Sequence, residues 1–287
     1  MKIDYVILSS DKNPFYLDFW EPVSLMWREK IGIKPILAFI GDQDQIVDHG
    51  TYIIHEIKTL PDIPVSFQAQ VIRLYLPKYY KKANCLISDI DTMPLNKDYF
   101  CAPAASMPEG EFLVYNGAAY PGRSRVPICF NLASGDTYTK MLRLESHDSF
   151  ASFCKFLLSL KLDRIPPYWN VDELYLGLCL QNAPPTIRIS QQNASLEYKS
   201  PSEYLLNYQT QIEPAPFARE VPPRYTSPPF IDRTRLPEVL EYHGLDAKQD
   251  LSHVSPDILL PYVCAHLERP QSWDTDKLIE LYLKEEK

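Results

Sequence analysis

The chain has 287 residues, of which 45% are hydrophobic and 23% are charged, a composition typical of a globular protein with a sizeable core. The net charge of −8, without a long run of Lys or Arg, argues against nucleic-acid binding. No apolar stretch approaches the roughly 20 residues that a membrane span requires.

The N-terminus and the cysteines both favour a cytoplasmic location. Residues 1–6 lack the basic start, apolar block and cleavage site of a signal peptide. The six cysteines are scattered without a C-x-x-C pair, as expected for free thiols in a reducing compartment. We therefore expect a cytoplasmic protein whose cysteines are mostly buried.

The first quarter of the chain alternates strands and helices. Apolar residues predict a first strand over residues 3–8, which ends in a polar loop at Ser9 and Ser10. A helical pattern and two further apolar runs follow, over residues 15–30, 33–40 and 51–57. This alternation predicts an α/β sheet.

An amphipathic helix over residues 67–80 leads into a short apolar strand over residues 85–87. A helix just upstream of such a strand commonly lies along a ligand cleft. The planar guanidinium of Arg73 could then reach a phosphate or a sugar. The alternative interpretation is an ordinary solvated arginine on a helix face.

Two acids, Asp89 and Asp91, follow the strand directly. In an extended segment both would point to one side and Ile90 to the other, and Pro94 would end regular pairing. Adjacent carboxylates repel each other unless a cation lies between them, and Mg²⁺ or Mn²⁺ is held by carboxylate and phosphate oxygens. The pattern predicts a metal-diphosphate site at the carboxyl end of a strand, with an acidic turn as the alternative.

The second half of the chain continues the alternation. Strands are predicted over residues 112–115, 128–133 and 187–189, and helices over residues 137–144, 147–160 and 174–179. Asp172 and Glu173 precede the last of these helices, where a helix dipole stabilises acids. The functional interpretation is that one of them accepts a proton from an attacking hydroxyl or holds sugar hydroxyls.

The C-terminal third is rich in proline and carries His243, a candidate metal ligand, with His253 as the alternative. The prolines among residues 190–235 indicate a long wrapped segment and not a separate domain. Two short helices are predicted over residues 257–267 and 272–283.

The order of these features resembles the glycosyltransferases of the GT-A fold, closest to the retaining group with glycogenin-like and lipopolysaccharide galactosyltransferase-like enzymes. The resemblance covers residues 1 to about 180. It implies a Rossmann-like mixed central sheet flanked by helices, with a Pro-rich C-terminal extension. One catalytic domain would span 1–287, with a nucleotide-sugar half (1–100), an acceptor half (101–190) and a wrapped extension (191–287).

The same resemblance implies roles for particular residues. Asp89 and Asp91, together with His243, would hold Mn²⁺ or Mg²⁺ on the donor diphosphate. The residues that would bind the nucleotide-sugar donor are Ser9, Ser10, Arg73 and Asp89. Asp172 and Glu173 would lie near the anomeric carbon as the catalytic acids. The chain departs from the family at Ser88, and of the family's His-x-x-Gly-x-x-Lys-Pro-Trp tail only His243 and Lys248 are present.

We therefore expect a metal-dependent glycosyltransferase that moves a hexose or pentose from a nucleotide-diphosphate donor, a UDP-sugar, to a hydroxyl of a glycan or glycoconjugate. Homo-oligomerisation is left open. One alternative is a carbohydrate-binding or scaffolding protein on the same fold. Another is a phosphatase of the haloacid dehalogenase type, although its D-x-D motif normally lies on the first strand, with Thr or Val where Met93 stands here.

Overall fold

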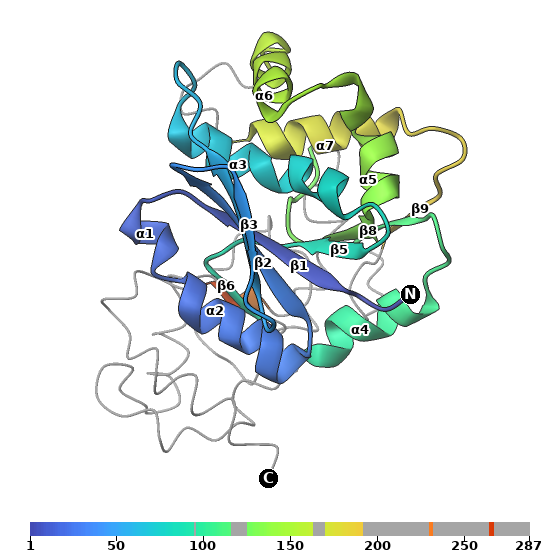
Figure 1. Cartoon of the computed structure of the whole chain (residues 1–287). Coiled ribbons are helices and arrows are strands. Elements are labelled where there is room, and N and C mark those ends of the chain that lie inside the picture. Colours follow the sequence, from blue (N-terminus) through green and yellow to red (C-terminus); the bar gives the residue numbers. More distant parts are fainter. Residues whose placement is uncertain (95, 116–124, 163–169, 192–229, 232–263, 267–287) are drawn as a thin grey trace, which may run out of the picture.

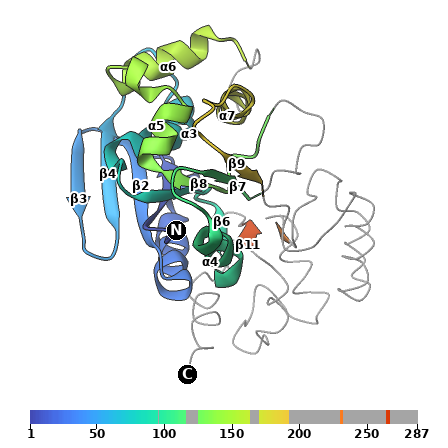
Figure 2. The ribbon, with the colours of Figure 1, turned by 90° about the vertical axis from the view of Figure 1, so that its right-hand side faces the viewer.

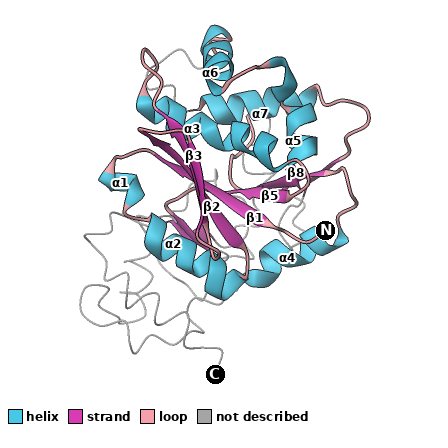
Figure 3. Ribbon diagram, in the orientation of Figure 1, coloured by secondary structure: helices cyan, strands magenta, loops and turns pink. Residues whose placement is uncertain are grey.

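The computed structural model describes residues 1–94, 96–115, 125–162, 170–191, 230–231 and 264–266 (Figure 1). These residues confirm the predicted α/β class, with a mixed sheet flanked by helices on both faces (Figures 1 and 3). The strands of the main sheet are β1 (Tyr5–Ser10), β2 (Lys34–Gly41), β3 (Gln45–Asp48), β4 (Ile53–Lys58), β5 (Asn84–Ile87), β7 (Phe112–Val114), β8 (Asn131–Ser134) and β9 (Ile189–Gln191). Their order across the sheet is β3-β4-β2-β1-β5-β8-β7-β9.

The centre of the sheet is parallel. Strand β1 pairs with β2 on one side and with β5 on the other, and β4 continues the parallel arrangement beyond β2. The chain thus builds outward from β1 to β2 and β4, and then returns to the other side of β1 with β5. Such a reversal is a topological switch point, and open α/β sheets bind ligands outside the carboxyl ends of the strands there. The residues that follow β1 and β5 are therefore the first place to look for a site.

Both margins of the sheet are mixed in direction. Strand β3 is antiparallel to β4 at one edge, and β8 is antiparallel to its neighbours β5 and β7. The other edge strand, β9, is parallel to β7. Figure 2 shows β3 at one end of the sheet and β9 toward the other.

A small second sheet joins distant segments of the chain. It consists of β6 (Thr92–Pro94), β10 (Phe230–Ile231) and β11 (Cys264–His266), in the order β10-β11-β6. Pro94 is the last residue of β6, as expected of a residue that ends regular pairing, and it is itself opposite Cys264 in an antiparallel pair. Strand β11 also replaces part of the helix predicted over residues 257–267.

The helices lie in two layers. They are α1 (Pro14–Leu17), α2 (Trp20–Met26), the π-helix η1 (Trp27–Ile31), α3 (Val65–Tyr75), the 3-10 helix η2 (Leu76–Tyr80), α4 (Lys97–Ser106), α5 (Gly135–Met141), the 3-10 helix η3 (Leu144–Ser146), α6 (Phe150–Ser159) and α7 (Val171–Gln181). Figure 1 shows α3, α5, α6 and α7 on one face of the sheet and α2 and α4 on the other. Helix α4 was not predicted from the sequence; Asn96 caps it by accepting a hydrogen bond from the Tyr99 N–H.

Two predicted boundaries near the N-terminus are corrected. The helix expected over residues 15–30 is divided into α1, α2 and η1. Pro22 explains the break before α2, because a residue without an N–H is tolerated in the first turn of a helix and not in its interior. Ser9 and Ser10 are the last residues of β1 and not part of a loop, and both are buried.

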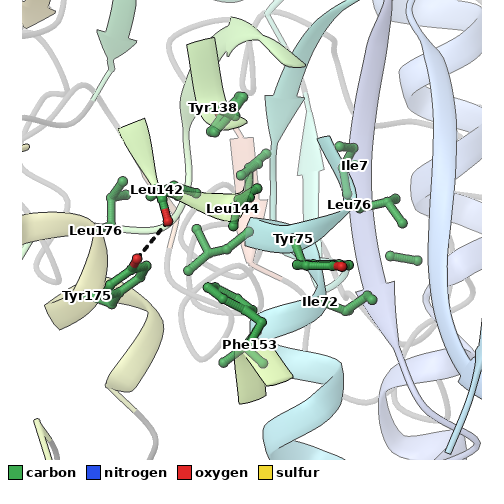
Figure 4. Packing of buried hydrophobic residues seen from close by; sticks show 14 of the residues in the cluster. Ile7, Ile72, Tyr75, Leu76, Tyr138, Leu142, Leu144, Phe153, Tyr175 and Leu176 are labelled. Carbon is green, nitrogen blue, oxygen red and sulfur yellow. Dashed lines mark hydrogen bonds between the residues drawn. The ribbon is translucent and has the colours of Figure 1, made fainter. Parts of the chain in front are cut away.

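The main core lies between the sheet and the layer of α3, α5, α6 and α7 (Figure 4). Tyr75 of α3 and Phe153 of α6 are fully buried in it, with their ring centroids 5.5 Å apart. The hydroxyl of Tyr175 in α7 donates a 2.7 Å hydrogen bond to the Leu142 carbonyl. Phe153 also packs against Tyr175, with ring centroids 5.9 Å apart, so α6 connects α3 to α7 through aromatic contacts.

Candidate functional site

The acidic motif lies in a turn at the switch point of the sheet. Pairing of β5 with β1 extends to Ser88, whose N–H donates to the Ile7 carbonyl at 3.0 Å. The Thr92 N–H then bonds to the Asp89 carbonyl at 3.3 Å. This i to i+3 bond makes a turn, so the extended segment that the sequence predicted here is wrong. Ile90 is nevertheless buried while Asp89 and Asp91 are half-buried, so apolar and acidic side chains separate as expected.

Arg73 joins this turn to α7. Its Nη1 pairs with Oδ1 of Asp89, and its Nη2 donates to Oδ2 of Asp172 at 2.8 Å. The side chain of Arg73 is 11% exposed, that of Asp172 1% and that of Asp89 25%. We call Arg73 with these two carboxylates the Arg73 bridge. Asp89 is the member of the bridge that solvent and ligands can reach most readily.

Asp172 is held by further donors. Its Oδ1 accepts hydrogen bonds from Gln70 Nε2 at 2.9 Å and from the Glu173 N–H at 2.8 Å. Gln70 is also tied to the arginine, since the Gln70 carbonyl accepts a 3.1 Å bond from Arg73 Nε. Sequence reasoning missed a role for Gln70. The available signal was its spacing of three residues from Arg73 on one helix, which places both side chains on the same face.

Glu173 belongs to a neighbouring polar group. It lies 3.6 Å from Nη1 of Arg125, and the same nitrogen donates to Asn170 Oδ1 at 2.7 Å. Asp172 and Glu173 occupy the first turn of α7, as predicted, and Asn170 is at its N-cap position without a capping side-chain bond. Arg125 was not singled out by sequence analysis, because an isolated arginine at a loop exit carries no local pattern.

Burial and charge act against each other in the Arg73 bridge. Burial lowers the pKa of the Arg73 guanidinium, but the attraction of Asp89 and Asp172 outweighs this and raises the pKa above its ordinary value. Burial raises the pKa of the Asp172 carboxyl above its ordinary value, and Arg73 and the Glu173 N–H reduce this rise without cancelling it. Arg73 therefore stays charged, and its positive charge stabilises a carboxylate that burial alone would disfavour.

The predicted nucleoside contacts, Ser9 and Ser10, lie at the carboxyl end of β1, opposite Ala38 and Phe39 of β2 and beyond the residues that pair with β5. Their placement inside the strand leaves little of either side chain exposed. The Ser10 hydroxyl donates to the Asp11 carbonyl at 3.0 Å. The loop that follows β1 therefore consists of residues 11–13, where the Asn13 N–H bonds to the Asp11 side chain at 2.9 Å.

The carboxylates of the turn suit a hard divalent ion, because Mg²⁺ and Mn²⁺ prefer oxygen ligands and take several of them from a bound phosphate. Within the described ranges, no group of three His, Cys, Asp or Glu side chains is placed to hold a metal by itself. The residues that are present fit an ion completed by a diphosphate better than one enclosed by protein ligands. The predicted third ligand His243, and His253, lie outside the described residues.

No family model matches the sequence, and no curated protein matches it. Among solved structures, the apo form of the glycosyltransferase GlyE of Streptococcus pneumoniae TIGR4 is similar at 12% identity, over 77% of this chain and 52% of that chain, with a TM-score of 0.44. A second GlyE structure is similar at 11% identity, over 99% of this chain and 60% of that one, with a TM-score of 0.46.

The galactosyltransferase LgtC, in complex with donor and acceptor sugar analogs, is similar at 12% identity, over 97% of this chain and 95% of that chain, with a TM-score of 0.44. This chain thus spans little more than half of the GlyE chains that it matches. Across the described ranges, no helix is both long enough and apolar enough to cross a bilayer.

Proposed function

We propose that this protein is a metal-dependent glycosyltransferase, which moves a sugar from a UDP-sugar to a hydroxyl of a glycan or glycoconjugate. The observation that carries the proposal is the Arg73 bridge. It couples the acidic turn after β5 to the first turn of α7, beside the switch point of the sheet. Ligands of open α/β sheets bind at that place, and a planar guanidinium suits phosphate and sugar oxygens.

We assign different roles to the two acids of the turn. Arg73 already balances part of the charge on Asp89, so Asp89 with Arg73 is suited to orienting the donor. Asp91, the second acid of the D-x-D pattern, is assigned to the metal, with Asp89 beside it and His243 as the proposed third ligand. A bound divalent cation would supply electrostatic stabilisation of the departing diphosphate.

The acidic pair of α7 lies across the Arg73 bridge from the turn. In the reaction, the bond between the anomeric carbon and the diphosphate breaks, a bond to the acceptor oxygen forms, and the acceptor hydroxyl loses its proton. Glu173 keeps 15% of its side chain exposed. We assign to it the orientation of the reacting sugar or the uptake of that proton.

The phosphatase alternative loses support from the described fold. A phosphatase of the haloacid dehalogenase type carries its D-x-D motif on the first strand, whereas here the motif follows β5 and β1 ends in Ser9 and Ser10. The carbohydrate-binding alternative differs from the transferase in its ligands, so a binding experiment separates the two.

A thermal-shift experiment with UDP, UDP-glucose and UDP-galactose, each with and without MnCl₂, tests the proposal. A ligand that binds only the folded state at 100 times its Kd adds about 2.7 kcal/mol to the free energy of unfolding. We expect the nucleotides to raise Tm with Mn²⁺ and to do so much less without it. The variant Asp91→Asn should lose the Mn²⁺-dependent part of this increase in Tm. Its Tm without ligand should stay within a few degrees of that of the original protein.

If UDP raised Tm equally with and without Mn²⁺, and equally in the original protein and in Asp91→Asn, the metal assignment would be contradicted. A shift with free oligosaccharides, without any response to nucleotides, would favour the carbohydrate-binding alternative. Release of UDP from the sugar nucleotide that gives the largest shift then reports turnover, and excess chelator should abolish it.

A further inference from the structure

We propose that Gln70 and Asp172 are positioning residues, which hold Arg73 so that its Nη1 stays on Asp89. The inference rests on the proposed transferase function and refines it, because it removes Asp172 from direct contact with the substrate. It assigns a role to Gln70, a residue that neither the D-x-D pattern nor the acidic pair includes.

Hydrogen-bond donors already surround the Asp172 carboxylate. Its Oδ1 accepts bonds from Gln70 and from the Glu173 N–H, and its Oδ2 accepts one from Arg73. An ionised carboxylate offers about four lone-pair sites. Three are in use, and the side chain is 1% exposed. A group in this state is poorly placed to take a proton from a substrate hydroxyl, so the base role predicted for Asp172 does not fit its surroundings.

Gln70 contacts both members of the Asp172–Arg73 pair. Its carbonyl accepts from Arg73 Nε at 3.1 Å, and its side-chain amide donates to Asp172 Oδ1 at 2.9 Å. Arg73 therefore has its Nε, Nη1 and Nη2 directed at three different oxygens. With Nε and Nη2 fixed, the plane of the guanidinium is fixed too, and Nη1 can point only toward the acidic turn.

An amide at position 70 suits the charges of this site. A neutral donor stabilises the Asp172 carboxylate without altering the charge around Asp89 and Asp91. A lysine would add a positive charge that competes with a metal ion, and a glutamate would add a negative charge beside a buried acid. Asp172, in the first turn of α7, thereby determines the orientation of the Arg73 guanidinium toward the nucleotide-sugar.

The variant Gln70→Leu tests the inference, because it replaces the side-chain amide that donates to Asp172 with an apolar group of similar size. Loss of a residue that orients the groups of a metal site through hydrogen bonds typically lowers activity about tenfold or more. We expect kcat for UDP release from UDP-glucose or UDP-galactose, with MnCl₂, to fall about tenfold while KM changes less than about threefold. The reason is that Asp89 and Asp91 remain in place while Arg73 is no longer held in one orientation.

The matched control is Gln68→Leu on the same helix. Gln68 is fully buried, and its side-chain amide bonds to Leu60 and Ile63 in the preceding loop, away from the Arg73 bridge. This variant should lower Tm more than Gln70→Leu does and leave kcat unchanged at a temperature where it is folded. Equal kcat in Gln70→Leu and the original protein, or equal losses of kcat in both variants, would overturn the inference.

A second measurement does not depend on catalysis. The ¹⁵Nε–¹H signal of Arg73 should shift in Gln70→Leu and in Asp172→Asn, and the double variant should show no larger shift than Asp172→Asn alone, since Gln70 acts through Asp172. An unmoved Arg73 signal, or additive shifts, would overturn the positioning role even if the protein binds UDP and Mn²⁺. Failure of the original protein to bind UDP and Mn²⁺ would instead overturn the proposed function.

Discussion

At the scale of single residues, Arg73 makes contacts that a lysine could not make. Its planar fork contacts carboxylates from two elements at once, through separate nitrogens. The carboxylate of Asp172 is buried, and a buried charge is costly unless it is paired and hydrogen-bonded. Stability and the proposed function therefore depend on the same side chain.

Replacement of Arg73 by leucine should be strongly destabilising, because it leaves the buried Asp172 without its cationic partner. Removal of one partner from a buried pair costs about 3–5 kcal/mol. Chemical denaturation measures the change in the free energy of unfolding. Lys140→Leu serves as the control, because it breaks the exposed pair of Lys140 with Asp136 and should cost far less stability. Similar losses in the two variants would show that Asp172 is not charged in the folded protein.

A second prediction at this scale concerns pH. His55 in β4 is buried, with Nδ1 3.3 Å from the Tyr80 hydroxyl, and burial lowers its pKa from 6.5 to about 4, although Asp44 acts in the opposite direction. The unfolded chain takes up this proton first as pH falls. The free energy of unfolding should therefore be fully retained above pH 6.5 and decline between about pH 6.5 and pH 4.

The contribution of His55 over this window is about 3 kcal/mol. The variant His55→Gln should lower the slope of stability against pH between pH 6.5 and about pH 5, measured by denaturation at a series of pH values. His49→Gln removes the same titratable group from an exposed position and is the matched control. An unchanged slope in His55→Gln would show that the ring takes up its proton over the same pH range in the folded and the unfolded chain.

At the scale of elements, the site depends on how closely helices meet. The layer of α3, α5, α6 and α7 is packed through aromatic side chains, and α5 begins at Gly135 against the end of the α3–η2 segment. A Cβ at Gly135 would lie 2.4 Å from the carbonyl oxygens of Pro77 and Tyr80. Close approach, and not conformational freedom, is the reason for glycine at this position.

Gly135→Ala should therefore destabilise the protein, because two backbone oxygens would have to move. Overpacking of this kind costs about 1–3 kcal/mol. Gly50→Ala is an informative comparison, since Gly50 has a φ of +82° and a Cβ added there would meet no atom within 4 Å. Its cost should be only that of the left-handed backbone, about 1–2 kcal/mol. A smaller loss in Gly135→Ala than in Gly50→Ala, by thermal or chemical denaturation, would contradict the packing at α5.

At the scale of the whole molecule, the described residues form a main mixed sheet, with the acidic turn at its switch point, and a small second sheet. The α/β class, most strands of the sheet and the position of Asp89 and Asp91 after a buried strand were predicted correctly. The roles of Ser9, Ser10 and the metal ligands, and the three-part division of the chain, stay predictions. The edge strand β3 and helix α4 were missed, since an exposed four-residue strand and a helix with Pro103 inside it have weak local patterns.

Local sequence determined the elements, because runs of apolar residues and their spacing report burial within a few residues of the chain. The pairing of Arg73 with Asp172, 99 residues apart, was decided only by the tertiary structure, as was the antiparallel contact of β6 with β11. The physical reason is that strand order and helix packing bring these residues together, and neither leaves a periodic signal in the chain. The sequence thus located the acids, and the fold determined which of them is buried, which is accessible and which arginine joins them.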